Sequence, residues 1–310
     1  MTVDGPLAPP HRSPPPSELV PAAGDVVSTG LEGSLGVAHQ RVLRRLLRRP
    51  VGVVGLVLAG VFVVTGVVGP AMVPHDPFAV VGPSLSAPSL AHPMGTDALG
   101  RDLLSGVVVG ARTSLVVAVV VGAVVMAIGV VVGTLSSWWG GWADDVLMRL
   151  TELFQVLPRF FLAVVVIAIF GSSVLLLIVV LGLTSWPLLA RVLRAEVLVL
   201  KHREFVDAAR VAGASPARLV LREILPNALP AVSAFLGLIL AQVLLIEASL
   251  GFIGLGDPNV VSWGYLASQS QRFLRVAWWM SLFPGLAIAT AVLGLNLVSD
   301  ALSDLLGTSR

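Results

Sequence analysis

Residues 51–69 read VGVVGLVLAGVFVVTGVVG, nineteen residues without a charged side chain. A helix needs about 20 mostly apolar residues to cross the roughly 30 Å hydrocarbon core of a bilayer, so this stretch predicts a membrane-spanning helix. Similar stretches recur to the end of the chain, and one of them, 154–190, is interrupted by Gly-Ser-Ser at 171–173. We therefore predict an all-α polytopic membrane protein. Its six spans would cover about 51–69, 113–133, 154–170, 174–190, 229–250 and 277–298.

The composition of the 310 residues supports this fold class. Hydrophobic residues make up 56% of the chain and charged residues 12%, and the mean hydropathy is +0.92. A soluble domain carries roughly a quarter of charged residues, so most of this surface faces something other than water. The net charge of +2 is too small to indicate a nucleic-acid partner, because proteins that bind nucleic acid usually carry a strongly basic surface. The absence of cysteine excludes disulfides, thiolate nucleophiles and Cys-ligated metals.

The single lysine, Lys201, lies between Leu200 and His202. The phosphate-binding loop of many ATPases requires a Gly-Lys-Ser/Thr sequence, which this chain therefore cannot form. We expect no cofactor in this chain and no enzymatic activity of its own. If ATP drives the protein, ATP and Mg²⁺ are bound by another chain.

The basic residues predict the topology. Cytoplasmic loops of membrane proteins carry an excess of Lys and Arg. Seven basic residues lie in 191–228 and five in 41–49, so we place both regions in the cytoplasm. An even number of crossings must then separate them, which makes 171–173 a turn between two spans. Reading 154–190 as one long helix would instead place 191–228 outside. Six spans put both termini in the cytoplasm.

The remaining segments follow from these spans. Residues 1–40 contain seven prolines and predict a disordered cytoplasmic tail. Residues 41–50 predict a basic helix in the inner membrane interface, and 51–310 form the transmembrane domain. Residues 70–112, with six prolines, and 251–276 are the outer segments, the first expected to be a non-helical cover.

The cytoplasmic loop 191–228 contains its own helix signals. A short helix begins at Glu204 with an acidic first turn, and Gly213 supplies a stop. Ser215 is a natural N-cap for a second helix, expected to end at Pro226. Such a short, partly apolar unit could fit a groove of a soluble partner, or it could pack against its own bundle.

This loop resembles a known motif. Asp207-Ala208-Ala209, then Gly213 and Ile224-Leu225-Pro226-Asn227, is similar to the EAA loop of ABC importer permeases. Asp207 stands in place of the family's Glu, and Glu223 stands where an apolar residue is usual. The resemblance implies a coupling helix seated in a separate ATP-binding subunit. The implied coupling residues are Glu204, Phe205, Asp207, Ala208, Ala209, Gly213, Leu225 and Pro226.

The resemblance covers most of residues 90–306. The sequences HPMGTDALGRD at 92–102, GARTSL at 110–115 and EASLGFIGLG at 247–256 are similar to the C-type permease subunit of dipeptide, oligopeptide and nickel importers. This implies a type I ABC importer permease fold in the bacterial cytoplasmic (inner) membrane. The implied partners are a second permease subunit forming a heterodimer, two ATP-binding subunits or domains, and an extracytoplasmic substrate-binding protein.

Two further groups of candidate residues lie outside the loop. Four residues of the outer segments could meet the binding protein, although the charged ones could equally pair within the chain: Asp97, Arg101, Asp102 and Trp263. Glu247 is the only acid inside a predicted span, and an intramembrane carboxyl suggests a pore or gate residue or a helix-packing contact. Gln242 and Trp186 are weaker candidates for lining the passage.

The cargo and two rival functions stay open at this level. We expect peptides, while nickel, glutathione or another small solute remains an alternative. A secondary transporter would usually show several buried carboxylates or broken helices at mid-depth, and one peripheral glutamate supports it poorly. An intramembrane enzyme would need a metal-binding His pair or facing aspartates, which the predicted spans do not contain.

Overall fold

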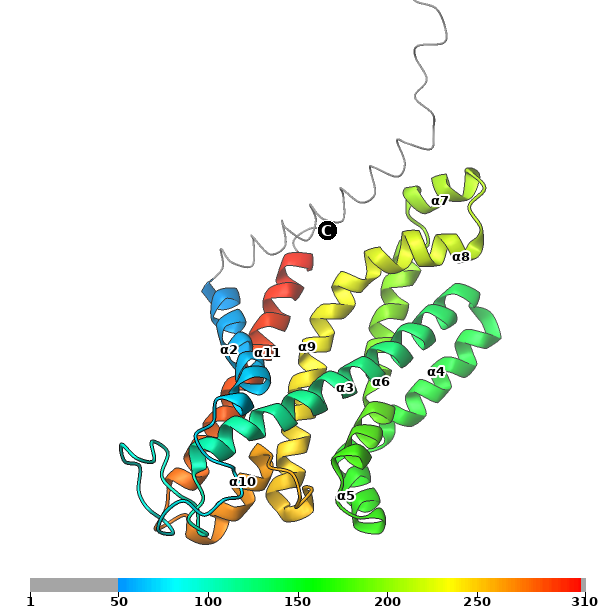
Figure 1. Ribbon diagram of the computed structural model, residues 1–310. Helices are drawn as coiled ribbons and strands as arrows, with labels where there is room; N and C mark the ends of the chain where they lie inside the picture. Colours follow the sequence, from blue (N-terminus) through cyan, green and yellow to red (C-terminus); the bar gives the residue numbers. More distant parts are fainter. Residues whose placement is uncertain (1–49, 308–310) are drawn as a thin grey trace, which may run out of the picture. The chain divides into compact units, whose positions relative to one another are not determined.

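The computed structural model describes residues 50–307. The expected tail (1–40) and interfacial helix (41–50) lie outside the described residues, except for Pro50, which begins the first helix. The described part is helical and contains no strand. Its elements are α2 (Pro50–Val68), η2 (Gly69–Ala71), α3 (Leu103–Trp139), α4 (Gly141–Val156), α5 (Arg159–Phe170), α6 (Val174–Leu200), α7 (Glu204–Val211), α8 (Pro216–Arg218), η3 (Leu219–Ile224), α9 (Leu225–Leu250), η4 (Gly251–Leu255), α10 (Trp263–Ser270), η5 (Gln271–Phe273) and α11 (Trp279–Gly307) (Figure 1).

The described helices confirm the all-α membrane fold. Five of them are long and apolar enough to cross a membrane, and α4 with α5 passes the same test as a pair bent by 73°. Counting the bent pair as one span gives six. The turn at 171–173 separates α5 from α6, and Gly171 adopts φ +92°, a region that glycine enters without steric cost.

Helix α3 is longer than expected. It has 37 residues and is therefore about 55 Å long, far more than a bilayer core requires. Because it begins at Leu103, the last ten residues of the outer segment 70–112 are helical, and the expectation of a non-helical cover was wrong there. The capping residue Asp102 starts the helix at this point.

The region 154–170 contains an unexpected break. Helix α4 ends at Val156 and α5 begins at Arg159, so the bend falls at Leu157-Pro158. A residue before proline is driven away from the α conformation, and Leu157 is indeed extended (φ −67°, ψ 122°). Helix α4 contacts α3 and α6, and after the bend α5 contacts α6.

The expected helix end at Pro226 was also wrong. The helical path continues from Pro216 to Leu255. The π-helical turn η3 precedes the proline, and the Leu225 N–H donates to the Val220 carbonyl five residues back. Pro226 then lies in the first turn of α9, where its missing N–H costs little.

Close packing of α3 against α6 forms the centre of the core. At Gly133 of α3, a Cβ atom would lie 2.6 Å from the Ala190 carbonyl oxygen, so only glycine permits this approach. At Gly129, four residues earlier, a Cβ atom would lie 2.4 Å from Cδ2 of the Leu189 side chain. Small residues at this spacing allow membrane helices to associate through van der Waals contact. Helices α9 and α11, and α2 and α11, pack side by side as well.

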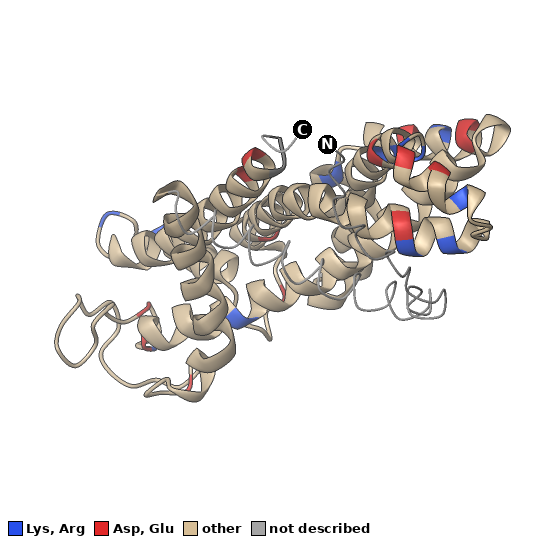
Figure 2. Ribbon diagram, turned by 90° about the horizontal axis from the view of Figure 1, so that it is seen from above, with Lys and Arg blue, Asp and Glu red and all other residues tan. Residues whose placement is uncertain are grey.

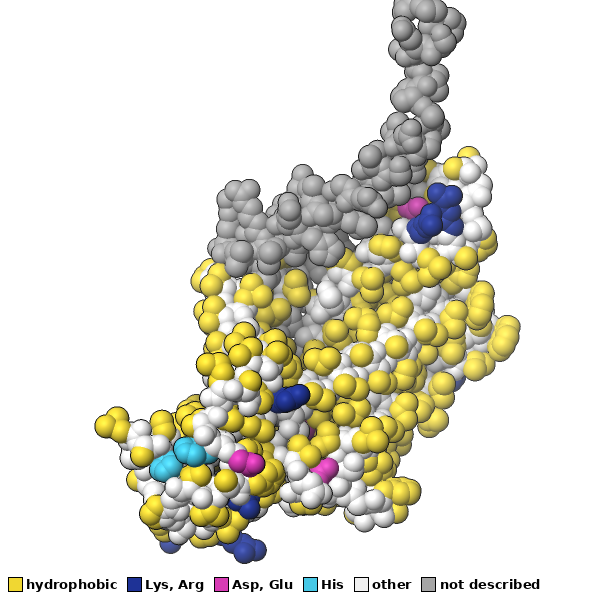
Figure 3. Space-filling model, in the orientation of Figure 1, with side chains coloured by type: hydrophobic (Ala, Val, Ile, Leu, Met, Phe, Trp, Pro, Cys, Tyr) yellow, Lys and Arg dark blue, Asp and Glu magenta, His cyan; other side chains and the backbone are white. Residues whose placement is uncertain are grey.

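Many of the charged residues lie together at one end of the helical bundle (Figure 2). On the face shown in Figure 3, apolar side chains cover the middle and charged ones lie mostly toward the two ends. The larger group lies on α4, the second half of α6, the connection 201–203, α7, α8 and η3. Its members are Asp144, Asp145, Arg149, Glu152, Arg191, Arg194, Glu196, Lys201, Arg203, Glu204, Asp207, Arg210, Arg218, Arg222 and Glu223.

Candidate functional site

Helix α7 is anchored through one apolar side chain. Val206 is completely buried and belongs to the main hydrophobic core with residues of α3, α6 and α9. Ala209 and Ala214 are partly buried against the same core. The inner face of α7 therefore packs on its own bundle, one of the two alternatives that the sequence left open.

The outer face of α7 is exposed. Phe205 is 40% exposed and Val211 90% exposed. Glu204, Asp207 and Ala208 lie on the exposed surface with them. The result is a rigid surface of two acids, an aromatic ring and small apolar side chains, which the described chain does not cover.

The turn after α7 depends on Gly213. It adopts φ +82°, and its N–H donates to the Arg210 carbonyl while the Ala214 N–H donates to the Ala209 carbonyl. Ser215 caps the next helix by accepting a hydrogen bond from the Arg218 N–H at 3.4 Å. Six of the eight expected coupling residues thus belong to α7 and its turn.

The other two, Leu225 and Pro226, lie where η3 meets α9 and are only partly exposed. Helix α7 contacts η3, the segment that directly precedes Leu225. Leu225 is partly buried against the main hydrophobic core.

Lys201 joins the base of α7 to the end of α3. Its Nζ donates to the Trp138 carbonyl at 2.9 Å and to the Ser137 carbonyl at 3.4 Å. The ammonium also lies 5.4 Å from the centroid of the Trp138 ring. The last carbonyls of a helix lack intrahelical partners and carry partial negative charge, so the cation is well placed there.

A second link joins α4 to α6. The Arg194 guanidinium donates to both carboxylate oxygens of Asp144, at 2.7 Å and 2.6 Å, and Arg191 donates to Gln155 at 2.8 Å. These partners are separated by 50 and 36 positions, respectively. No local pattern in the sequence could have indicated the pairing.

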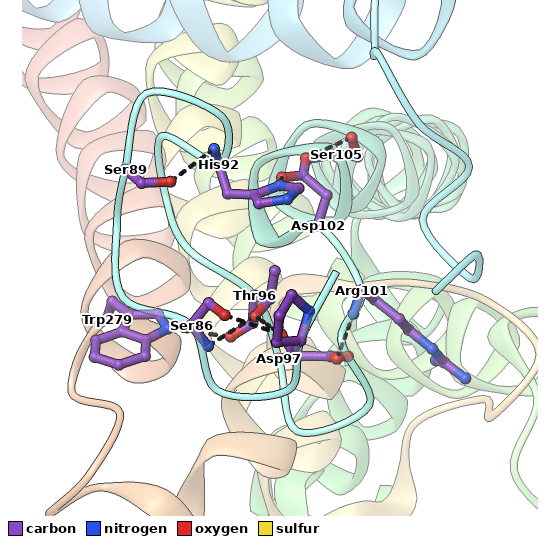
Figure 4. A network of polar contacts seen from close by, with 10 residues as sticks. Ser86, Ser89, His92, Thr96, Asp97, Arg101, Asp102, Ser105 and Trp279 are labelled. Atoms are coloured by element: carbon purple, nitrogen blue, oxygen red, sulfur yellow. Dashed lines mark hydrogen bonds and ion pairs between the residues drawn. The ribbon is translucent and has the colours of Figure 1, made fainter. Parts of the chain in front are cut away.

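At the other end of α3, the outer cap (residues 72–102) is held by Thr96. Its hydroxyl donates to the Pro83 carbonyl at 2.7 Å and accepts from the Ser86 N–H at 2.9 Å. Trp279 Nε1 donates to the Thr96 carbonyl at 3.1 Å (Figure 4). The cap is therefore fastened to the start of α11.

Asp97 and Arg101 shape a turn of this cap. One oxygen of the Asp97 carboxylate accepts from the Leu99 and Arg101 backbone N–H groups, both at 2.8 Å. The Arg101 guanidinium lies 5.3 Å from the centroid of the Phe78 ring. Both side chains are partly exposed, so they can meet a partner while they shape the cap.

Asp102 is instead part of the interior. It is 2% exposed and caps α3 by accepting from the Ser105 N–H at 2.9 Å and from the Ser105 hydroxyl at 2.7 Å. His92 Nδ1 lies 3.1 Å from its other oxygen (Figure 4). Burial raises the pKa of this carboxyl, but the hydrogen bonds from Ser105 and the contact with His92 outweigh that effect, and the pKa lies below its ordinary value. The expected contact between Asp102 and a binding protein therefore lacks an accessible side chain.

Trp263 is also buried, at 4% exposure, and its Nε1 donates to the Val107 carbonyl at 2.8 Å. The Thr113 hydroxyl donates to the Val261 carbonyl at 2.7 Å. Both bonds tie the second outer segment to α3. Trp263 thus acts as a packing residue here, and the surface role expected of it lacks an exposed ring.

The three residues considered for a pore have different surroundings. Glu247 on α9 is 6% exposed and accepts from the Ser114 hydroxyl of α3 at 3.2 Å. Trp186 is 3% exposed, donates to the Leu183 carbonyl and lies 5.5 Å from the Phe154 ring. Gln242, in contrast, is partly exposed near the middle of α9.

Within residues 50–307, no group of three or more His, Cys, Asp or Glu side chains could hold a metal ion.

Comparison with known proteins adds two family matches. Residues 125–309 match the family described as binding-protein-dependent transport system inner membrane component. Residues 39–93 match the N-terminal TM domain of oligopeptide transport permease C.

Curated relatives cover most of the chain. A Brucella suis protein named as a peptide transport system permease is 37% identical over 265 residues, covering 85% of this chain and 89% of the relative. The dipeptide transport system permease protein DppC of Alkalihalophilus pseudofirmus is 30% identical over 305 residues, with coverages of 97% and 95%. Among solved structures, an inward-facing MetNI methionine ABC transporter chain matches with a TM-score of 0.52 at 20% identity. The match covers 66% of this chain and 96% of that one, and at this identity it shows the fold alone.

Proposed function

We propose, from the premise that this chain belongs to the family of binding-protein-dependent transport system inner membrane components, that it forms half of a translocation path for peptides. The chain is a multi-pass permease of a bacterial ABC importer in the inner membrane. The names of its relatives, which refer to peptide and dipeptide transport, support peptides as the cargo.

The proposed assembly contains a second permease subunit, two ATP-binding subunits and an extracytoplasmic binding protein. The sequence supports the need for separate ATPases, because its single lysine cannot form a phosphate-binding loop. In this assembly α7 and both termini face the cytoplasm, and the outer cap faces the binding protein.

We propose that α7 transmits the movement of the ATPases to the spans. A partner shifts a conformational equilibrium only through different contacts with the two states, so the transmitting contact must be rigid. The observation that carries this proposal is that α7 exposes Glu204, Phe205 and Ala208 while Val206 anchors it in the core. Force applied to the outer face would reach α3, α6 and α9 through that anchor and through Lys201.

The test compares charge reversals in the assembled importer in vesicles. Glu204→Arg places a cation on the outer face of α7. We propose that the ATP-binding partner meets Glu204 with a basic group, so we expect ATP-driven uptake to fall about tenfold or more, because like charges at an interface cost several kcal/mol. Gly213→Pro should act similarly, since proline cannot adopt φ +82°. ATP hydrolysis should continue in both variants.

The matched control is Glu152→Arg, which reverses a charge on α4 that is 59% exposed. It should leave uptake unchanged. Normal uptake in both Glu204→Arg and Gly213→Pro would contradict the coupling role of α7.

Docking of the binding protein is proposed for the exposed side of the outer cap, at Asp97 and Arg101. Reversal of either charge should weaken the stimulation of ATP hydrolysis by the binding protein.

Gln242 is proposed to line the passage, because it is the partly exposed polar side chain near the middle of α9. An amide facing lipid at this depth would have an unsatisfied hydrogen-bonding group.

A further inference from the structure

Two hollows adjoin each other at the outer end of α9. The apolar hollow has a volume of about 320 Å³ and is lined by Leu245 and Ser249 of α9 and Ile288 of α11, among others. The polar hollow has a volume of about 640 Å³ and is lined by Ser268, Gln269 and Arg272, among others.

Phe252 and Ile253 line both hollows and form a ridge between them. Their side chains are 45% and 52% exposed. The helical path breaks beside this ridge, because Gly254 adopts φ 86° and ψ 13° inside η4. Gly254 belongs to the outer segment 251–276 and is exposed, so water can reach this side of the ridge.

The chemistry of the polar hollow selects an anion. Arg272 is the one charged residue that lines it. The Gln271 carboxamide donates to the Phe252 carbonyl and the Ser268 hydroxyl donates to the Tyr265 carbonyl. The Arg272 guanidinium and the Gln269 carboxamide are the other polar side-chain groups that line the hollow. A guanidinium binds a carboxylate through two parallel hydrogen bonds. The volume also falls in the range of small-molecule sites.

We propose that Arg272 binds the carboxyl-terminal carboxylate of a peptide entering from the outer side, while the apolar hollow beyond the Phe252–Ile253 ridge takes one of its apolar side chains. This inference rests on the proposed peptide cargo. It adds a cationic subsite on this subunit that recognises a feature shared by peptides of any sequence. A concave polar hollow that adjoins an apolar one suits a small amphipathic ligand better than a protein surface.

The test measures selectivity in the assembled importer, reconstituted in vesicles with its binding protein. Uptake of trialanine is compared with uptake of trialanine amide, which lacks the terminal carboxylate. We expect Arg272→Gln to lower the trialanine-to-amide uptake ratio by about three- to tenfold relative to the unmodified importer, because a partly exposed charge-assisted hydrogen bond is lost. Arg272→Lys should restore part of the ratio. Arg275→Gln, which removes an exposed arginine that does not line the hollow, should leave the ratio unchanged.

Each outcome bears on the inference. Because every variant uses the same binding protein, the selectivity of that protein cancels from the comparison. An unchanged ratio in Arg272→Gln would overturn the inference and leave the peptide cargo intact, and so would an equal change in Arg275→Gln. Equal loss of both uptakes, with weaker stimulation of ATP hydrolysis, would assign Arg272 to binding-protein docking instead. If the unmodified importer takes up neither compound, the proposed cargo fails and the inference fails with it.

Discussion

Replacement of Lys201 by methionine should loosen the inner end of α3. Methionine keeps most of the apolar stem but loses the ammonium that bonds the Trp138 and Ser137 carbonyls and lies over the Trp138 ring. A partly buried cation at a helix C-terminus contributes about 0.3–2 kcal/mol, and a cation–π contact at an exposed site about 0.5–1 kcal/mol. Because Lys201 is only half-buried, we expect a total loss of about 1–2 kcal/mol.

Amide hydrogen exchange in the last turn of α3 measures this loss directly. A cost of 1–2 kcal/mol corresponds to opening that is about 5- to 30-fold more frequent, so amides near residues 136–140 should exchange faster by that factor. Lys201→Arg keeps a cationic donor and should stay close to the unmodified protein. His202→Gln changes the exposed neighbour and serves as the matched control.

The same substitution should also weaken transport, because Lys201 links the base of α7 to α3. We expect Lys201→Met to reduce the uptake of cargo per ATP hydrolysed without reducing the amount of assembled importer. Unchanged exchange in Lys201→Met, or an equal increase in Lys201→Arg, would refute the reasoning that the ammonium holds this helix end.

The remaining predictions concern the two ends of the molecule. Because the pKa of Asp102 is lowered by folding, its stabilising contribution is complete above the unfolded-state pKa near 3.9 and is lost as the pH falls through the lower folded-state pKa. Asp102→Ala should cost about 0.5–2 kcal/mol at neutral pH because it removes the N-cap of α3, and an acid titration of unfolding should show a smaller loss of stability than in the unmodified chain. Arg194→Met leaves the partly buried Asp144 without its bidentate partner and should destabilise the fold by about 1.5–3 kcal/mol, with a double-mutant cycle showing the coupling to Asp144. Arg149→Met removes an arginine that is 85% exposed and should change thermal unfolding by no more than about 0.5 kcal/mol; an equal effect of the two arginines would show that the α4–α6 link contributes nothing special.

Each expected span overlaps a described helix, and the differences between their bounds have local causes. Helix α3 extends well beyond 113–133 because its sequence stays compatible with a helix on both sides of the apolar run. The bend at Leu157-Pro158 follows from a rule about proline that the run 154–170 also contained. The continuation past Pro226 depended on a π-helical turn, which no sequence period indicates.

Some candidate residues are positioned by their neighbours in the sequence, and others by contacts with distant parts of the chain. The exposed face of α7 and the turn at Gly213 follow from nearby residues, and the sequence identified them. Asp102 was considered either for docking or for pairing within the chain, and Trp263 was considered for docking, because only their loop position was visible. The contact of Asp102 with His92 agrees with pairing within the chain. The burial of the two side chains depends on His92 and on the distant Val107. The prediction that both termini are cytoplasmic stays a prediction.

The sequence by itself determined which stretches are long and apolar enough to form membrane-crossing helices and which loop is basic, because a bilayer has a fixed thickness and every backbone group inside it must be satisfied within the same helix. Only the tertiary structure decided which side chains meet. The pairing of Arg194 with Asp144, the contact of Lys201 with the end of α3, and the hollows beside Phe252 and Ile253 all depend on how whole helices pack. That packing is governed by close fits such as Gly133 against Ala190, which join residues far apart in the chain.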